Sequence, residues 1–226
     1  MAWLRGHWQL VALTAAIFTL WQTPVVIPLK ILVVIFHEMS HAAAAILTGG
    51  RVESFSVDFQ QGGAVWTQGG SRFVTLSAGY LGSLLIGVGL LLAALRWRAD
   101  RTVLGALGGL MLVVLVLYVR DVAAAVILAG TGAALLAAAR FLPGVACDLV
   151  LRVIGLSSLI YVPYDIFDDT LRRAALDSDA RMLAEAVGGT TMLWGVLWLG
   201  VSASVIAACL RYGLGRDSNL PLGRRA

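Results

Sequence analysis

The chain has 226 residues and a net charge of +4, with 59% hydrophobic and 13% charged residues. In a soluble globular domain about a quarter of the residues are charged, so this composition excludes such a domain and predicts a polytopic membrane protein with about six to seven transmembrane helices. The arginines gather at the ends of apolar segments and in the tail, a pattern typical of membrane anchoring rather than nucleic-acid binding.

Residues 1–226 are predicted to form a single membrane-embedded domain of the all-α class, with residues 211–226 as a mobile basic tail. The first span is expected at residues 8–26 and uncleaved, because no small-residue cleavage site followed by a soluble region comes after it. With seven spans, the two termini would lie on opposite faces of the membrane. Cys147 and Cys209 lie in or beside apolar segments, which indicates buried thiols.

The second span carries the sequence FHEMSHA at residues 36–42, inside an apolar run from about residue 29 to residue 48. On a helix, His37 and His41 lie one turn apart on the same face, so both imidazoles can bind one metal ion. In this H-E-x-x-H arrangement the histidines hold Zn²⁺, and Glu38 accepts a proton from the attacking water. Ionisable groups at bilayer depth are costly without partners, so we favour a zinc site over a chance match.

The segment after the second span changes from a helical to an alternating period. Phe55, Val57 and Phe59 alternate with polar residues, which predicts a strand. A second strand is expected at residues 64–67 and a possible third at residues 72–75. Proteases bind substrates in extended form, so an edge of this small β-hairpin or sheet can pair with a substrate. A plain interfacial hairpin is an equally good interpretation.

Further helices are expected along the rest of the chain. Gly79, Ser83 and Gly87 form a small-residue stripe on the third span, which is typical of close helix packing rather than of a direct catalytic role. The later spans are expected at about residues 76–95, 102–119, 122–139, 148–167 and 191–210, with a short helix outside the membrane at residues 177–188.

A third zinc ligand is needed, because catalytic zinc takes three protein ligands and keeps one position open. The remaining histidine, His7, lies far upstream at the N-terminal interface, so we expect a carboxylate. Asp165, at the end of an apolar segment, is the preferred candidate and Asp168 is the alternative. In a purely structural interpretation these acids end the helix and pair with the arginines that follow, at positions 172 and 173.

Three stretches of the chain are similar to motifs of a known family. They are FHEMSHA at residues 36–42, SAGYLGS at residues 77–83 and PYD at residues 163–165. With these stretches in the same order, the chain resembles the site-2 protease family of intramembrane zinc metallopeptidases, and more closely its short bacterial members without a PDZ domain. The chain departs from the family pattern at Tyr80, where the family has Pro, and at Ile166, where it has Gly. It also lacks an Asn before Pro163.

The resemblance implies a Zn²⁺-dependent endopeptidase in a bacterial cell membrane. Its expected zinc ligands are His37, His41 and Asp165, and its expected substrates are membrane proteins such as single-span regulatory proteins. Glu38 would take a proton from water and later deliver it to the leaving amine.

Two other functions are alternatives to the peptidase. A catalytically silent membrane scaffold should have lost Glu38 or one histidine of the pair, and both histidines and the glutamate are present. A metal-ion transporter should distribute its ligands over several helices, whereas the third to fifth spans carry no ionisable group within them.

Overall fold

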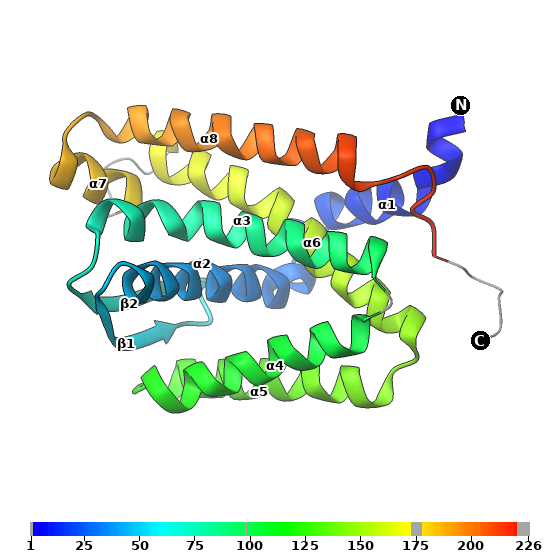
Figure 1. Ribbon diagram of the computed structural model, residues 1–226, viewed down its shortest axis with the longest axis horizontal. Coiled ribbons are helices and arrows are strands. Elements are labelled where there is room, and N and C mark those ends of the chain that lie inside the picture. The colour runs from blue at the N-terminus through cyan, green and yellow to red at the C-terminus, as the bar shows by residue number, and fades with distance from the viewer. Residues whose placement is uncertain (1, 98, 173–177, 221–226) are drawn as a thin grey trace.

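The computed structural model describes residues 2–97, 99–172 and 178–220, which form a helical bundle with one small sheet (Figure 1). The helices of these residues are α1 (Ala2–Thr19), α2 (Ile27–Leu47), α3 (Arg72–Arg96), α4 (Asp100–Tyr118), α5 (Val122–Phe141), α6 (Gly144–Phe167), α7 (Asp179–Val187) and α8 (Thr191–Ala208). A 3-10 turn, η1 (Pro24–Val26), precedes α2, and π-helical turns extend α6 (η2, Asp168–Arg172) and α8 (η3, Cys209–Gly213). The strands are β1 (Arg51–Val57) and β2 (Gly63–Gln68), so the predicted all-α class with a small sheet is confirmed.

Six helices among the described residues are long and apolar enough to cross a membrane. They are α2 with η1, α3, α4, α5, α6 with η2, and α8 with η3. The predicted first span at residues 8–26 is not one of them, because α1 begins earlier and includes the polar residues Arg5, His7 and Gln9. The structure has six such spans, and its first and last described segments lie together, since the Ser218 amide donates to the Gly6 carbonyl at 2.8 Å. The expectation of termini on opposite faces is therefore wrong.

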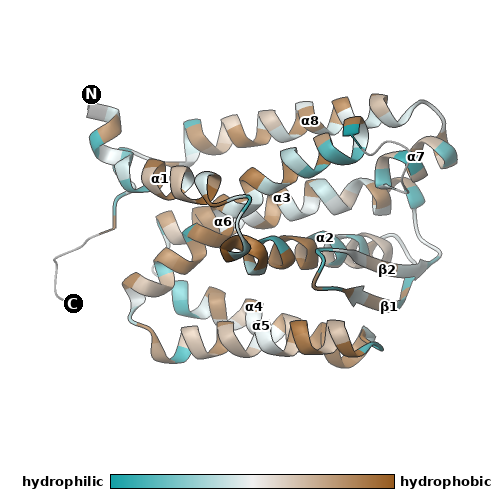
Figure 2. Cartoon of the chain, turned by 180° about the vertical axis from the view of Figure 1, so that it is seen from behind, coloured by the Kyte–Doolittle hydropathy of each residue, from teal (hydrophilic) through white to brown (hydrophobic). Residues whose placement is uncertain are grey.

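The spans differ in how deeply they are buried. The most apolar windows of α2 and α6 are 61% buried and that of α3 is 50% buried, against 22% to 28% for α4, α5 and α8. Accordingly α2, α3 and α6 lie in the middle of the bundle, with α8 on one side and the α4–α5 hairpin on the other (Figure 1). Figure 2 shows apolar residues along the outer helices, as expected for surfaces that face lipid.

The central helices approach closely at small residues. A Cβ on Gly155 of α6 would lie 2.8 Å from the carbonyl oxygen of Gly87 on α3, so only glycine fits at this crossing. Packing of this kind is the main source of helix association in a bilayer, where lipid and side chains are equally apolar. The packing role predicted for Gly87 is thus confirmed.

The sheet lies beside α2 in both views (Figures 1 and 2). β1 and β2 pair antiparallel with Phe55 opposite Val65, and Phe55 also bridges Val119 at the end of α4. The possible third strand at residues 72–75 is wrong. Ser71 accepts a hydrogen bond from the Val74 amide and caps the start of α3, so the chain turns helical there.

The segment after η3 runs back along α1. The Leu220 amide donates to Gln9 Oε1 at 2.5 Å, and the Asn219 side chain donates to the Arg5 carbonyl at 2.8 Å. Part of the predicted tail at residues 211–226 is therefore bonded to α1. Residues 221–226 lie outside the described residues.

Candidate metal centre

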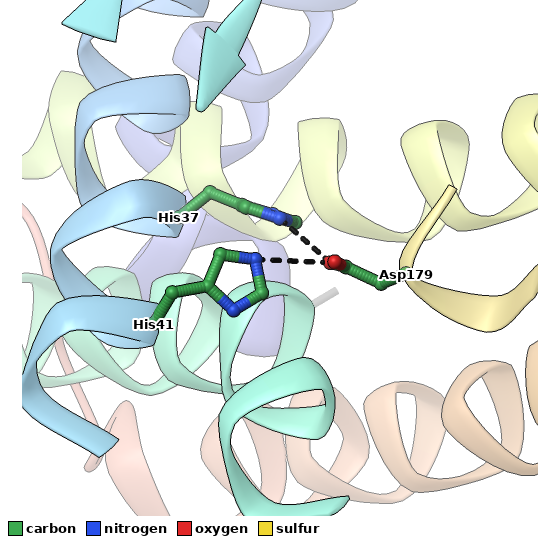
Figure 3. A group of neighbouring side chains, drawn as sticks. All are labelled: His37, His41 and Asp179. Atoms are coloured by element: carbon green, nitrogen blue, oxygen red, sulfur yellow. Dashed lines mark hydrogen bonds and ion pairs between the residues drawn. The ribbon is translucent and has the colours of Figure 1, made fainter. Parts of the chain in front are cut away.

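The two histidines of α2 point at one carboxylate oxygen (Figure 3). His37 Nε2 lies 2.9 Å and His41 Nε2 lies 3.1 Å from Oδ2 of Asp179. Among the described residues, these three side chains form a group that could hold a metal ion, with their ligand atoms all within 4.8 Å of one another. The prediction that the histidine pair shares one helix face is confirmed.

The hydrogen bonding of His41 makes this group a good fit for a metal ion. His41 Nδ1 lies 2.6 Å from the Thr75 carbonyl oxygen, which can only accept, so Nδ1 carries the proton. In neutral His41, Nε2 is then a lone pair directed at a carboxylate oxygen. Two acceptors at 3.1 Å repel each other unless a positive species lies between them, either a proton on Nε2 or a bound cation. Two imidazoles and a carboxylate are ligands that zinc prefers.

Asp179 is held in place by the start of α7. The Ser178 side chain accepts a hydrogen bond from the Arg181 amide and caps the helix, and Asp179, Ala180 and Leu183 are its buried residues. Burial raises the pKa of the Asp179 carboxyl, but the adjacent His41 and His37 outweigh it and bring that pKa well below its ordinary value. The two imidazoles thus favour the ionised form of this buried carboxyl, which is the form that binds a metal.

The structure differs from the sequence analysis at the third ligand. Asp165 and Asp168 line the same cavity as the histidines but do not belong to the group of ligand atoms. Asp168 forms an ion pair with Arg172 at 3.7 Å, as the structural interpretation of these acids expected. The physical reason is that α7, outside the spans, turns its N-terminus onto α2 and places Asp179 against both imidazoles.

One sequence signal could have identified Asp179. On a helix it lies one turn before Leu183, so it places an acid on the apolar face of an otherwise amphipathic segment. A site within a span favours a ligand at span depth, whereas Asp179 lies outside the spans. A helix that lies across the end of a bundle can still deliver a side chain to a buried site.

Glu38 lies next to the metal group and is buried, with 6% of its surface exposed. The start of β2 packs directly on it, because a Cβ on Gly63 would lie 2.6 Å from Glu38 Oε1 and 2.8 Å from Val34. The sheet thus covers the side chain that the sequence analysis assigned as the base. Only a glycine at position 63 leaves room for this carboxylate.

Gly79 of α3 has a second function besides helix packing. A Cβ at this position would collide with His37 Nε2 and His41 Nε2. The backbone of α3 at Gly79 therefore packs directly against the two imidazoles. Thr75 of the same helix orients His41. Gly79 was interpreted as part of a packing stripe, and the structure places it directly against the candidate ligands.

A cavity of about 1300 Å³ opens onto the group. Its walls come from α2, β2, α3, α7 and the end of α6, and residues 63–67 of β2 line it throughout. The acids that line it are Glu38, Asp165, Asp168, Asp169 and Asp179. Such a volume holds many water molecules as well as a segment of peptide, so both reactants of a hydrolysis can reach the group.

A helical membrane bundle with two histidines, a carboxylate and an adjacent glutamate at a cavity defines a polytopic membrane protein with a candidate metallopeptidase centre. The chain belongs to the Peptidase M50B-like family, whose model matches residues 10–209. This match confirms the resemblance to the site-2 protease family and includes every helix from α2 to α8. No curated protein and no solved structure matches the chain significantly. Bacterial origin remains a prediction.

Proposed function

We propose that this protein is an intramembrane zinc-dependent endopeptidase that hydrolyses peptide bonds in or near the transmembrane segments of membrane proteins. The observation that carries the proposal is the convergence of His37, His41 and Asp179 on one point beside Glu38, at the wall of a cavity inside the bundle. Membership in a peptidase family supports the same activity. Its expected location is a bacterial cell membrane.

Each residue of the site has a distinct part in the proposed reaction. His37, His41 and Asp179 would hold Zn²⁺, which when bound polarises the scissile carbonyl and lowers the pKa of water toward about 7. Glu38 accepts the proton of the attacking water and then donates it to the leaving amine. Thr75 keeps His41 in the tautomer with a free Nε2. Gly63 has no side chain and therefore leaves room for the Glu38 carboxylate at the cavity wall.

The open edge of β2 is the proposed place for the substrate. In the described part of the chain β2 pairs with β1 alone, and its residues 63–67 line the cavity. A transmembrane helix must unwind before cleavage, because its peptide bonds are shielded by their own hydrogen bonds. An extended segment next to β2 would replace those bonds with backbone pairing and would place its carbonyls beside the metal group. A single-span regulatory protein is the expected kind of substrate.

The arrangement supports an enzyme over the two other functions. A transporter would need successive ligand groups along a path, and the described residues contain one such group, formed around a single pair of histidines. A silent scaffold has no use for a buried glutamate beside that group, because an acid in this position costs free energy.

Cleavage of a transmembrane model substrate by purified protein in detergent tests the proposal. Glu38→Gln should keep its zinc and lose at least about a hundredfold in cleavage rate, because general-base catalysis contributes about 10² to 10⁴. The matched control is Glu53→Gln, an exposed glutamate of β1, which should cleave at the wild-type rate. If the Glu38→Gln protein retains full activity, the base assignment is wrong. A zinc-loaded wild type that cleaves no membrane substrate contradicts the peptidase itself.

A further inference from the structure

Tyr80 connects the metal group to the end of α6. It lies on α3 with 1% of its surface exposed, and its ring packs T-shaped against the His37 imidazole, with 4.7 Å between centroids. Trp198 of α8 lies behind it at 5.3 Å. The Tyr80 hydroxyl donates to Asp169 Oδ2 at 2.6 Å. A single side chain thus contacts a candidate ligand and an acid on η2.

The two histidines are oriented in different ways. His41 donates through Nδ1 to the Thr75 carbonyl, which fixes its ring. For His37, the hydrogen bond found among the described residues is the one from Nε2 to Asp179, on the ligand side. Metal-binding histidines are usually oriented by a hydrogen bond from the other ring nitrogen. The His37 ring is therefore oriented by the groups packed around it, among them Gly79, Tyr80 and the His41 ring.

The bond between Tyr80 and Asp169 makes this packing rigid. A tyrosine hydroxyl held at 2.6 Å by a carboxylate forms a charge-assisted hydrogen bond, which is stronger than one between neutral groups. The bond also ties η2 to α3, since Asp169 belongs to the π-helical turn that ends α6. The Tyr80 side chain is consequently held by Asp169 at its hydroxyl and by packing of its ring against Trp198.

We propose that Tyr80, anchored by Asp169, is a positioning residue that holds the His37 imidazole in the geometry for metal binding. The proposal rests on the proposed function, in that it takes His37 as a zinc ligand. It also gives a physical meaning to the tyrosine at a position where the site-2 protease pattern has proline. Neither Tyr80 nor Asp169 belongs to the group of ligand atoms, so their removal should distort the site without eliminating it.

Metal binding measured on the purified protein tests this role. The readouts are the zinc dissociation constant, from competition with a chelator, and the visible absorption spectrum of the cobalt-substituted protein. Tyr80→Phe keeps the ring and removes the hydroxyl, and Asp169→Ala removes the acceptor. Each should weaken zinc binding by about tenfold, the lower end of what outer-sphere partners contribute, and should change the cobalt bands. Asp169→Asn, which can still accept the bond, should restore both.

The double variant and a control separate positioning from general packing. If the residues act as one unit, Tyr80→Phe combined with Asp169→Ala should bind zinc within about twofold of either single variant. Tyr164→Phe removes the hydroxyl of another tyrosine of the cavity and should bind zinc like the wild type. A Tyr80→Phe protein with wild-type zinc affinity and cobalt bands would overturn the proposal. Failure of the wild type to bind any metal would instead overturn the proposed function.

Discussion

The described residues place histidines in two groups of polar side chains, His37 and His41 in one and His7 in the other, and the two groups differ in what surrounds them. At the far end from the metal group, His7 Nδ1 lies 2.7 Å from Ser218 Oγ. Arg152, with 4% of its surface exposed, bonds Asp148 at 2.5 Å and also donates to the Ser218 carbonyl. This cluster contains its own cation, Arg152, and does not line the cavity at the metal group.

The group at the metal end differs, because it contains a carboxylate and two imidazoles but no arginine or lysine. His37 Nε2 and His41 Nε2 both point at one Asp179 carboxylate oxygen, and the cavity gives access to this group. The comparison teaches that a buried histidine beside a polar partner is not by itself a metal site. A metal site needs ligand atoms that converge on one point at the wall of a cavity, where a cation can reach them. The far cluster instead joins the C-terminal segment to α1 and α6.

Removing one histidine from each cluster should give opposite results. His41→Ala should lower the zinc content from about one per chain to near zero and abolish cleavage, because two protein ligands hold zinc poorly. His7→Ala should keep both zinc and cleavage, since His7 bonds Ser218 of the C-terminal segment and packs on Trp3, and does not belong to the group of ligand atoms. Elemental analysis and a cleavage assay measure the two outcomes. Equal zinc loss in both variants would contradict the distinction between the clusters.

Arg152 tests the structural role of the far cluster. Arg152→Leu leaves the Asp148 carboxylate without its cation, so the free energy of unfolding should fall by about 3 to 5 kcal/mol. Thermal unfolding in detergent, followed by tryptophan fluorescence, measures the loss. The control is Arg51→Leu, whose side chain is 71% exposed and should contribute little. At temperatures where the Arg152→Leu protein is folded it should still bind zinc, and loss of zinc from the folded variant would show that the two ends are coupled.

Asp121 offers a smaller, pH-dependent test far from either cluster. Its side chain caps α5, and the hydrogen bond from the Ala124 amide lowers the pKa of its carboxyl. Because the pKa is lowered in the folded state, the ionised cap stabilises the fold fully at a pH above the ordinary Asp pKa of about 4. This stabilisation is lost as the pH falls through the folded-state pKa. Asp121→Ala should cost about 1 kcal/mol at neutral pH. Asp121→Asn should keep the cap and remove this pH dependence, and an unchanged dependence in that variant would refute the assignment.

The parts of the site that depend on local sequence were predictable. His37, Glu38 and His41 lie within five residues of one helix, so the helical period alone brings the histidines together. The short helix at residues 177–188 was predictable as well, because Ser178 and Gly188 are ordinary start and stop signals. Gly188 has φ of +100°, a conformation that favours glycine.

The parts that depend on long-range packing were not predictable. Asp179 is 142 residues from His37, and its place in the site depends on how α7 packs against α3 and α8. The acid on the apolar face of α7 marks Asp179 as unusual, but no local pattern encodes its contact with His37, and the motif match at residues 163–165 favours Asp165 instead. The prediction of a third strand at residues 72–75 is wrong for a local reason, because the N-cap at Ser71 starts a helix despite the strand propensities of the residues that follow.

The most direct test of the account is the zinc content of purified protein in four versions: wild type, Asp179→Ala, Asp165→Ala and Asp168→Ala. The account predicts about one zinc per chain in the wild type and in the Asp165 and Asp168 variants, and almost none in Asp179→Ala. Elemental analysis, with folding checked by thermal unfolding, gives the answer. Zinc retained in Asp179→Ala and lost in Asp165→Ala would contradict the site described here and return the third ligand to α6.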